Sequence, residues 1–218
     1  MKNIQNKLNN QLKRIINITD SVFAVALTLL VIDIRIPIIE NPTDGILWNS
    51  LKELKWTVLG FIISFFIVGY YWSVHHRIFG YVKEYTTRLM WLNLIFLLSV
   101  VLLPFTSGFL GKFAFNIELV LPYALYVFNI CLTAFANSIL WFYVSNPKNN
   151  LLTYKISKER IYLGFYFTLV VPILFIISLL IVLINPIFGR LIPLAIPFVL
   201  RYGLTGLTKK IILKENSN

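Results

Sequence analysis

Four stretches of the chain contain no charged side chain over a length that crosses a lipid bilayer. About 20 predominantly apolar residues suffice for one crossing by a helix. Because lipid offers no hydrogen bonds to the backbone, we expect these stretches to be helices that satisfy their own backbone groups. They are Trp56–Val74, Leu89–Gly111, Leu119–Asn146 and Ile161–Ile184.

A fifth apolar stretch, Ile15–Ile32, is long enough to span but includes Asp20. A basic start followed by an apolar stretch also occurs in secretory signal peptides. Here, however, no small-residue cleavage site follows, and Asp33 and Arg35 come next. We therefore expect this stretch to be a helix of the mature protein.

The last apolar stretch, Pro186–Thr208, is the least regular of the six. It contains Arg190 and Arg201, whose long side chains can reach the two membrane interfaces. Pro193 and Pro197 predict a kink, because proline removes a backbone donor and crowds the preceding turn. A re-entrant hairpin is the alternative to a sixth crossing.

The pattern thus predicts an all-α membrane protein of six transmembrane helices in a single domain, residues 1–218. Composition agrees, since 58% of the residues are hydrophobic, only 13% are charged and the mean hydropathy is +0.77. Soluble domains carry about 25% charged residues. The single cysteine, Cys131, excludes a disulfide scaffold and is expected to be a small apolar filler. The expected helices cover about 14–36, 56–78, 88–111, 118–146, 160–184 and 186–208.

The net charge of +11 is distributed unevenly over the predicted loops. With the N-terminus inside, fifteen of the 20 lysines and arginines lie on the cytoplasmic side. Such a bias in short loops predicts that both termini are cytoplasmic. We interpret the basic tails as topology signals that contact anionic membrane lipids, and not as a nucleic-acid site. The basic residues on the other side are Arg35, Lys52, Lys55, Lys112 and Arg190.

Two features of the first helix bear on function. At about 100° per residue, Val25, Thr28, Leu29 and Ile32 share one face, whereas Asp20 points about 140° away from Val25. An ionisable residue inside a membrane helix is costly and is by default a functional hypothesis. The alternative is that the aliphatic face is ordinary and that Asp20 is simply a satisfied buried carboxylate.

The same helix carries a recognisable motif. Arg14 through Leu30 reads RIINITDSVFAVALTLL, which resembles the first-helix signature of the transmembrane protein 175 family, the lysosomal potassium channels and their prokaryotic relatives. The family pattern has Phe-Ser-Asp where this chain has Ile18-Thr19-Asp20. Threonine keeps the hydroxyl, while isoleucine loses the ring. The resemblance continues through WSVHHR at 72–77, WLN at 91–93 and LPF at 103–105, and so covers about the first half of the chain.

The resemblance implies a potassium-permeable cation channel of the prokaryotic cytoplasmic membrane, assembled as a homotetramer of six-helix subunits. It further implies that the first helices line a central pore without a backbone-carbonyl filter. Carried over by motif position, the aliphatic rings of the constriction are Val25, Leu29 and Ile32, and Thr28 supplies a hydroxyl layer. Such a ring of aliphatic side chains can gate by expelling water. No cofactor is implied beyond the permeating potassium ion.

Polar residues near the cytoplasmic end of the first three helices form a second candidate group. His75 and His76 end the second helix, and Trp72 and Asn93 are expected at a similar depth. The resemblance implies that such residues hold the pore helix to its neighbours. For the histidines, an interfacial anchor is an equal alternative, pH sensitivity is a further possibility, and a metal ligand lacks supporting carboxylates or cysteines at ligand spacing. The whole predicted network is Arg14, Thr19, Asp20, Trp72, His75, His76 and Asn93.

Two other function classes compete with the channel. A proton-coupled carrier would relay protons through Asp20 and the histidine pair. A membrane-embedded enzyme acting on lipids would need a catalytic pair facing a cavity, and only Asp20 with a histidine could supply one. Phosphate-binding glycine loops, paired catalytic carboxylates and Ser/His/Asp motifs are absent from the sequence, so we do not expect an enzyme.

Overall fold

The computed structural model describes residues 2–35, 38–39, 41–113 and 116–203. Within these residues, five helices are long and apolar enough to cross a membrane. The chain is therefore an all-helical, multi-pass membrane protein. The five candidate spans are Asn10–Asp33, Lys55–Gly80, Thr87–Lys112, Val120–Ser145 and Lys158–Val182.

The first helix differs from its predicted bounds of 14–36. Helix α1 covers Lys2–Leu29 and continues as a 3-10 helix, η1, over Leu30–Asp33. It begins earlier than predicted because the polar residues before Arg14 include neither glycine nor proline, the two residues that most oppose a helix interior. Residue 36 lies outside the described residues.

The next four spans match the sequence prediction to within two residues at each end. They are α3 (Lys55–Gly80), α4 (Thr87–Lys112), α5 (Val120–Ser145) and α6 (Lys158–Val182). Two of them begin at hydroxyl N-caps. Thr86 Oγ1 accepts from Leu89 N–H at 3.1 Å, and Ser157 Oγ accepts from Arg160 N–H at 3.3 Å. Such caps satisfy backbone donors that a helix leaves open at its start.

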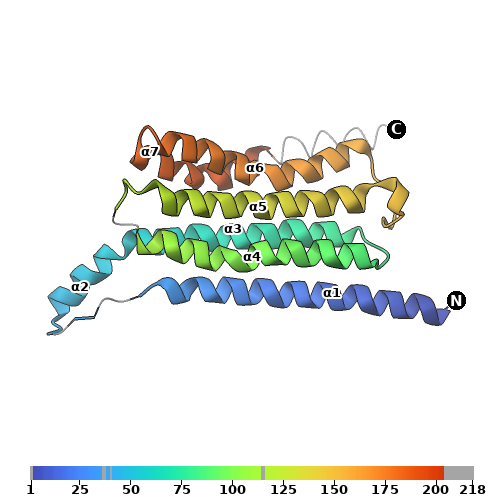
Figure 1. Cartoon of the computed structure of the whole chain (residues 1–218), viewed down its shortest axis with the longest axis horizontal. Helices are drawn as coiled ribbons and strands as arrows, with labels where there is room; N and C mark the ends of the chain where they lie inside the picture. Colours follow the sequence, from blue (N-terminus) through green and yellow to red (C-terminus); the bar gives the residue numbers. More distant parts are fainter. Residues whose placement is uncertain (1, 36–37, 40, 114–115, 204–218) are drawn as a thin grey trace.

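The helices lie side by side with α1 at one edge of the bundle (Figure 1). Helix α1 packs on α3 and α4, while α5 lies between α4 and α6. One buried core connects all of them, with Phe23 of α1, Tyr71 of α3, Phe96 of α4 and Phe175 of α6 each at most 1% exposed. Helix α1 therefore has one packed face and one face that the other described helices do not cover.

A short helix that the sequence analysis did not predict lies between α1 and α3. Helix α2 covers Asp44–Glu53, and Thr43 caps it by accepting from Ile46 N–H at 3.4 Å. None of its residues is buried. In Figure 1 it extends away from the bundle at the end opposite the N-terminus.

The sixth segment folds back along α6 as a broken helix. Helix α7 covers Pro186–Leu191, a 3-10 helix, η3, covers Ile192–Ala195, and residues 196–203 are again helical. The interruption at Ile192–Ala195 includes Pro193, one of the two prolines from which a kink was predicted, whereas Pro197 lies in the helical stretch that follows. Gly189 permits the close return to α6, because a Cβ at that position would lie 2.5 Å from the backbone nitrogen of Val182. Residues 204–208 of the predicted span lie outside the described residues, and a full sixth crossing stays a prediction.

Two loops are paired at the end of the bundle where α1 begins. The α3–α4 loop and the α5–α6 loop form an antiparallel bridge between Val82 and Leu152. Lys83 N–H donates to Leu151 C=O, and Thr153 N–H donates to Tyr81 C=O, each at 2.9 Å. The pairing joins the ends of four helices directly through the backbone.

Candidate functional site

The packed face of α1 and of the first residue of η1 is defined by five residues that recur at spacings of three and four. Ile15, Thr19, Phe23, Ala26 and Leu30 are each no more than 6% exposed. This spacing is the one expected for a single stripe along a helix. The stripe fixes the rotation of α1 about its own axis, and so decides which residues point away from the bundle.

The four residues predicted to form the constriction lie on the uncovered face of α1. Val25 is 55% exposed, Leu29 is 40% exposed and Ile32, in the 3-10 turn, is 61% exposed. Thr28 is also exposed, and its Oγ1 donates to Val25 C=O at 2.9 Å. Because that bond uses the hydroxyl proton, the oxygen can present only its acceptor side to a ligand.

The buried part of the predicted polar network forms one continuous chain across three helices. Asn93 Nδ2 of α4 donates to Thr19 Oγ1 of α1 at 2.9 Å, and Asn93 Oδ1 lies 2.7 Å from His75 Nε2 of α3. Thr19 Oγ1 in turn donates to Ile15 C=O at 2.9 Å. All three side chains are at most 2% exposed. The structure thus ties α1 to both of its neighbours at a single level.

His75 is held between aromatic rings. Its ring stacks on Phe96 at 5.1 Å with an interplanar angle of 4°, and on Phe79 at 4.4 Å and 24°. Phe23 of α1 lies 6.3 Å away, centroid to centroid. A histidine enclosed in this way, with its Nε2 facing an amide oxygen, acts as a fixed part of the helix packing.

A second hydrogen bond between α3 and α1 involves Asp20. Trp72 Nε1 donates to Asp20 Oδ1 at 2.9 Å, and the Trp72 ring lies 5.6 Å from His76. His76 is exposed and is not part of the buried chain. Asp20, His75, His76 and Thr19 border a small pocket of about 110 Å³.

Within one chain, Arg14 is not hydrogen-bonded to the other members of the predicted network. Its side chain is exposed, and the described residues provide it with no hydrogen bond or ion pair. The structure therefore brings together six of the seven predicted residues in two groups, Thr19–Asn93–His75 and Asp20–Trp72–His76. In the described part of the chain, no group of three or more His, Cys, Asp and Glu side chains is placed to hold a metal ion.

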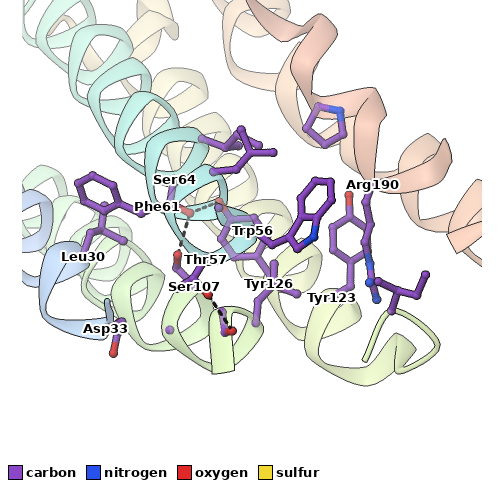
Figure 2. A pocket seen from close by; sticks show the side chains of 18 of the residues that line it. Leu30, Asp33, Trp56, Thr57, Phe61, Ser64, Ser107, Tyr123, Tyr126 and Arg190 are labelled. Carbon is purple, nitrogen blue, oxygen red and sulfur yellow. Dashed lines mark hydrogen bonds between the residues drawn. The ribbon is translucent and has the colours of Figure 1, made fainter. Parts of the chain in front are cut away.

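A second pocket, larger than the one beside Asp20, lies at the other end of the bundle and was missed from the sequence. It has a volume of about 300 Å³ and lies between η1, α3, α4, α5 and α7 (Figure 2). Its polar residues come from five separate elements, so no local sequence pattern links them. The only signal in the sequence was the isolated charge of Arg190 in an apolar stretch.

The fold is similar to those of two solved structures, each of which is described as a channel. The chain is similar to the crystal structure of a lysosomal potassium-selective channel TMEM175 homologue from Chamaesiphon minutus, with a TM-score of 0.71 and 24% identity, over 88% of this chain and 98% of that chain. It is also similar to a variant of the potassium channel MtTMEM175, with a TM-score of 0.58 and 20% identity, over 88% of this chain and 92% of that one.

The family model for the endosomal/lysosomal potassium channel TMEM175 matches residues 14–104. A potassium channel of Streptomyces collinus is 35% identical over 104 residues, 48% of this chain and 50% of that protein. The endosomal/lysosomal proton channel TMEM175 of Gallus gallus is 31% identical over 108 residues, 47% of this chain and 22% of that protein. These matches confirm the resemblance to the TMEM175 family that the first-helix motif indicated.

The matching region contains α1 from Arg14 onward, η1, α2, α3 and most of α4. A potassium channel of a Chryseobacterium species is 32% identical over 124 residues, 56% of this chain and 59% of that protein. The chain thus aligns with about half to three fifths of the length of these bacterial relatives.

Proposed function

We propose that the chain is one subunit of a homotetrameric, potassium-permeable channel in a prokaryotic cytoplasmic membrane, with α1 lining the shared pore. The observation that carries the proposal is the uncovered face of α1. A single subunit leaves Val25, Leu29 and Ile32 between 40% and 61% exposed, while the opposite face of the same helix is buried. Four copies placed with these faces toward one axis would enclose a narrow aliphatic passage.

The chemistry of that passage follows from its side chains. Rings of valine, leucine and isoleucine disfavour water, so a hydrated ion meets a desolvation barrier and the passage can close by dewetting. Between them, the acceptor side of Thr28 Oγ1 can replace part of the hydration shell of a cation. Because no cage of converging carbonyls surrounds the ion, we expect weak selectivity among monovalent cations.

The polar groups behind α1 set its position in this proposal. The Thr19–Asn93–His75 chain holds the buried face of α1 against α3 and α4, and Trp72 holds Asp20. Fixing the rotation of α1 keeps the aliphatic row directed at the axis. The charge bias of the loops supports a topology with both termini in the cytoplasm.

Current measurements on the purified protein in planar bilayers test the proposal. We expect an ohmic potassium current, and in Leu29→Ser a larger leak current with reduced selectivity, because the constriction loses a bulky apolar ring. Leu98→Ser is the matched control, since Leu98 of α4 is 62% exposed and does not lie on α1. An unchanged conductance in Leu29→Ser would remove Leu29 from the constriction.

The same preparation separates the channel from a proton-coupled carrier. A carrier would give a flux that saturates with the potassium concentration and moves protons in fixed stoichiometry. We expect neither property. A saturable, proton-coupled flux that is abolished in Asp20→Asn would favour the carrier and overturn the proposal.

A further inference from the structure

The larger pocket has one strongly basic and one acidic residue, and they lie far from each other along it. Figure 2 shows Arg190 and Asp33 at opposite ends, with Trp56, Phe61 and Tyr126 between them. From this arrangement we propose that the pocket binds one acyl chain of an anionic phospholipid, with the phosphate at Arg190. The proposal concerns binding alone and does not depend on the proposed channel function.

Arg190 supplies the charge that such a headgroup needs. Its Nη2 donates to Leu119 C=O at 2.9 Å, while its Nε is buried and has no hydrogen-bond partner in the described part of the chain. A buried donor of a charged group is costly to leave unpaired. Guanidinium groups pair with phosphate oxygens through two parallel N–H donors, so a phosphate at this end would pair with the charged group of Arg190.

The middle of the pocket does not require a polar ligand. Ser64 Oγ lies 2.8 Å from both Ser107 Oγ and Tyr126 Oη, so these hydroxyl groups satisfy one another (Figure 2). The remaining wall there is formed by aliphatic and aromatic side chains such as Phe61. A hydrocarbon chain therefore matches the interior, and the volume of about 300 Å³ is at the lower end of roughly 300–1,000 Å³ for small-molecule sites.

Asp33 fixes the direction in which an anionic lipid can enter. Its carboxylate lies over Gly108, where a Cβ would be only 2.2 Å from Asp33 Cγ and Oδ2. A negative headgroup at that end would meet the Asp33 carboxylate with the exposed Arg35 near it, whereas the described lining at the Arg190 end has no acidic residue. The headgroup therefore belongs at Arg190, and the acyl chain extends toward Phe61 and η1.

Trp56 provides a direct readout, because it lines the pocket. The purified protein in neutral detergent is titrated with phosphatidylglycerol whose acyl chains are brominated, and tryptophan quenching is followed. We expect saturable quenching that disappears in Trp56→Phe and is weaker with brominated phosphatidylcholine. Arg190→Gln should weaken binding by about tenfold, equivalent to about 1.4 kcal/mol, while Arg190→Lys should retain the preference for phosphatidylglycerol.

A matched pair of glycine variants tests the location. Gly60 lines the pocket and Gly69 does not, and in both cases an added Cβ meets nothing within 4 Å. Gly60→Leu should abolish the saturable quenching, because its side chain fills the pocket, and Gly69→Leu should leave it unchanged. Equal quenching by both lipids, full competition by inorganic phosphate alone, or intact quenching in Gly60→Leu would each overturn the proposal.

Discussion

Trp72 Nε1 lies 2.9 Å from Asp20 Oδ1, so α3 donates a hydrogen bond to the one acidic side chain in the middle of α1. The carboxylate therefore has a defined partner on the neighbouring helix rather than pointing freely into the membrane. The Trp72–Asp20 bond holds α1 to α3, and the buried Thr19–Asn93 bond holds α1 to α4. The position of α1 follows from these contacts as much as from apolar packing.

Replacing Trp72 by phenylalanine should lower the stability of the folded protein. Phenylalanine keeps an aromatic side chain but lacks the indole N–H that donates to Asp20. Hydrogen bonds to charged groups contribute about 1.5–3 kcal/mol, and because this one is exposed we expect a loss near the lower bound. Thermal unfolding in detergent measures the effect, with Trp91→Phe as control, since Trp91 is 59% exposed and makes no hydrogen bond within the described residues. Equal melting temperatures for the two variants would contradict the role of the bond.

Replacing Asn93 by leucine should be more costly, because it leaves two buried groups without their partner. His75 Nε2 loses its only side-chain hydrogen bond in the described residues, and Thr19 Oγ1 loses its donor. Each unsatisfied buried group costs about 1–3 kcal/mol. A double-mutant cycle with Thr19→Val should show a coupling of about 0.5–3 kcal/mol. Strictly additive losses in stability would mean that the two side chains act independently.

Cysteine cross-linking tests whether the uncovered face of α1 meets other copies. In a Cys131→Ser background, Leu29→Cys should give covalent dimers after treatment with a short thiol cross-linker, because copies of this position converge on one axis in the proposed tetramer. Leu98→Cys, on the outer face of α4, should remain monomeric on a denaturing gel. If Val25→Cys, Leu29→Cys and Ile32→Cys all stay monomeric, the shared axis does not pass along this face.

Much of the architecture was predictable because membrane helices are specified by long uncharged runs. The helices expected at 56–78 and 88–111 lie within two residues of α3 and α4 at each end. Helix α2 was missed because its signal, a threonine cap before a short half-polar stretch, is local and weak. The broken path after Leu191 depends partly on Pro193, which the sequence displays, and partly on the contact of Gly189 with α6, which it does not.

For the candidate site, the sequence indicated groups of residues, and their role in a pore stays a prediction. Residue periodicity separated Val25 and Leu29 from the buried side of α1, and the family motif indicated Asn93 and His75 as members of one network. Neither could show that His76 and Arg14 remain outside the buried chain, because that depends on side-chain directions set by the tertiary packing. The pocket at Arg190 was unpredictable for the same reason, since its walls come from several distant segments.

Gly164 tests the packing between α5 and α6. A Cβ at this position would lie 2.4 Å from Cε2 of Trp141, a ring that is 2% exposed and donates from Nε1 to Ile161 C=O at 2.9 Å. Because the ring cannot easily move, Gly164→Ala should destabilise the protein by about 1–3 kcal/mol. Gly69→Ala, which meets no atom within 4 Å, should instead be neutral or slightly stabilising. Thermal unfolding compares the two, and similar melting temperatures would argue against the tight contact.

The backbone bridge between Val82 and Leu152 limits how the protein can be modified. Each of the two connections is hydrogen-bonded to the other through Lys83 and Thr153, so neither can be lengthened without losing bonds that the other needs. An epitope or fluorescent label inserted into the α3–α4 loop or the α5–α6 loop would therefore disturb the ends of four helices. The helix at Asp44–Glu53, which has no buried residue, is the better point of attachment for such a tag.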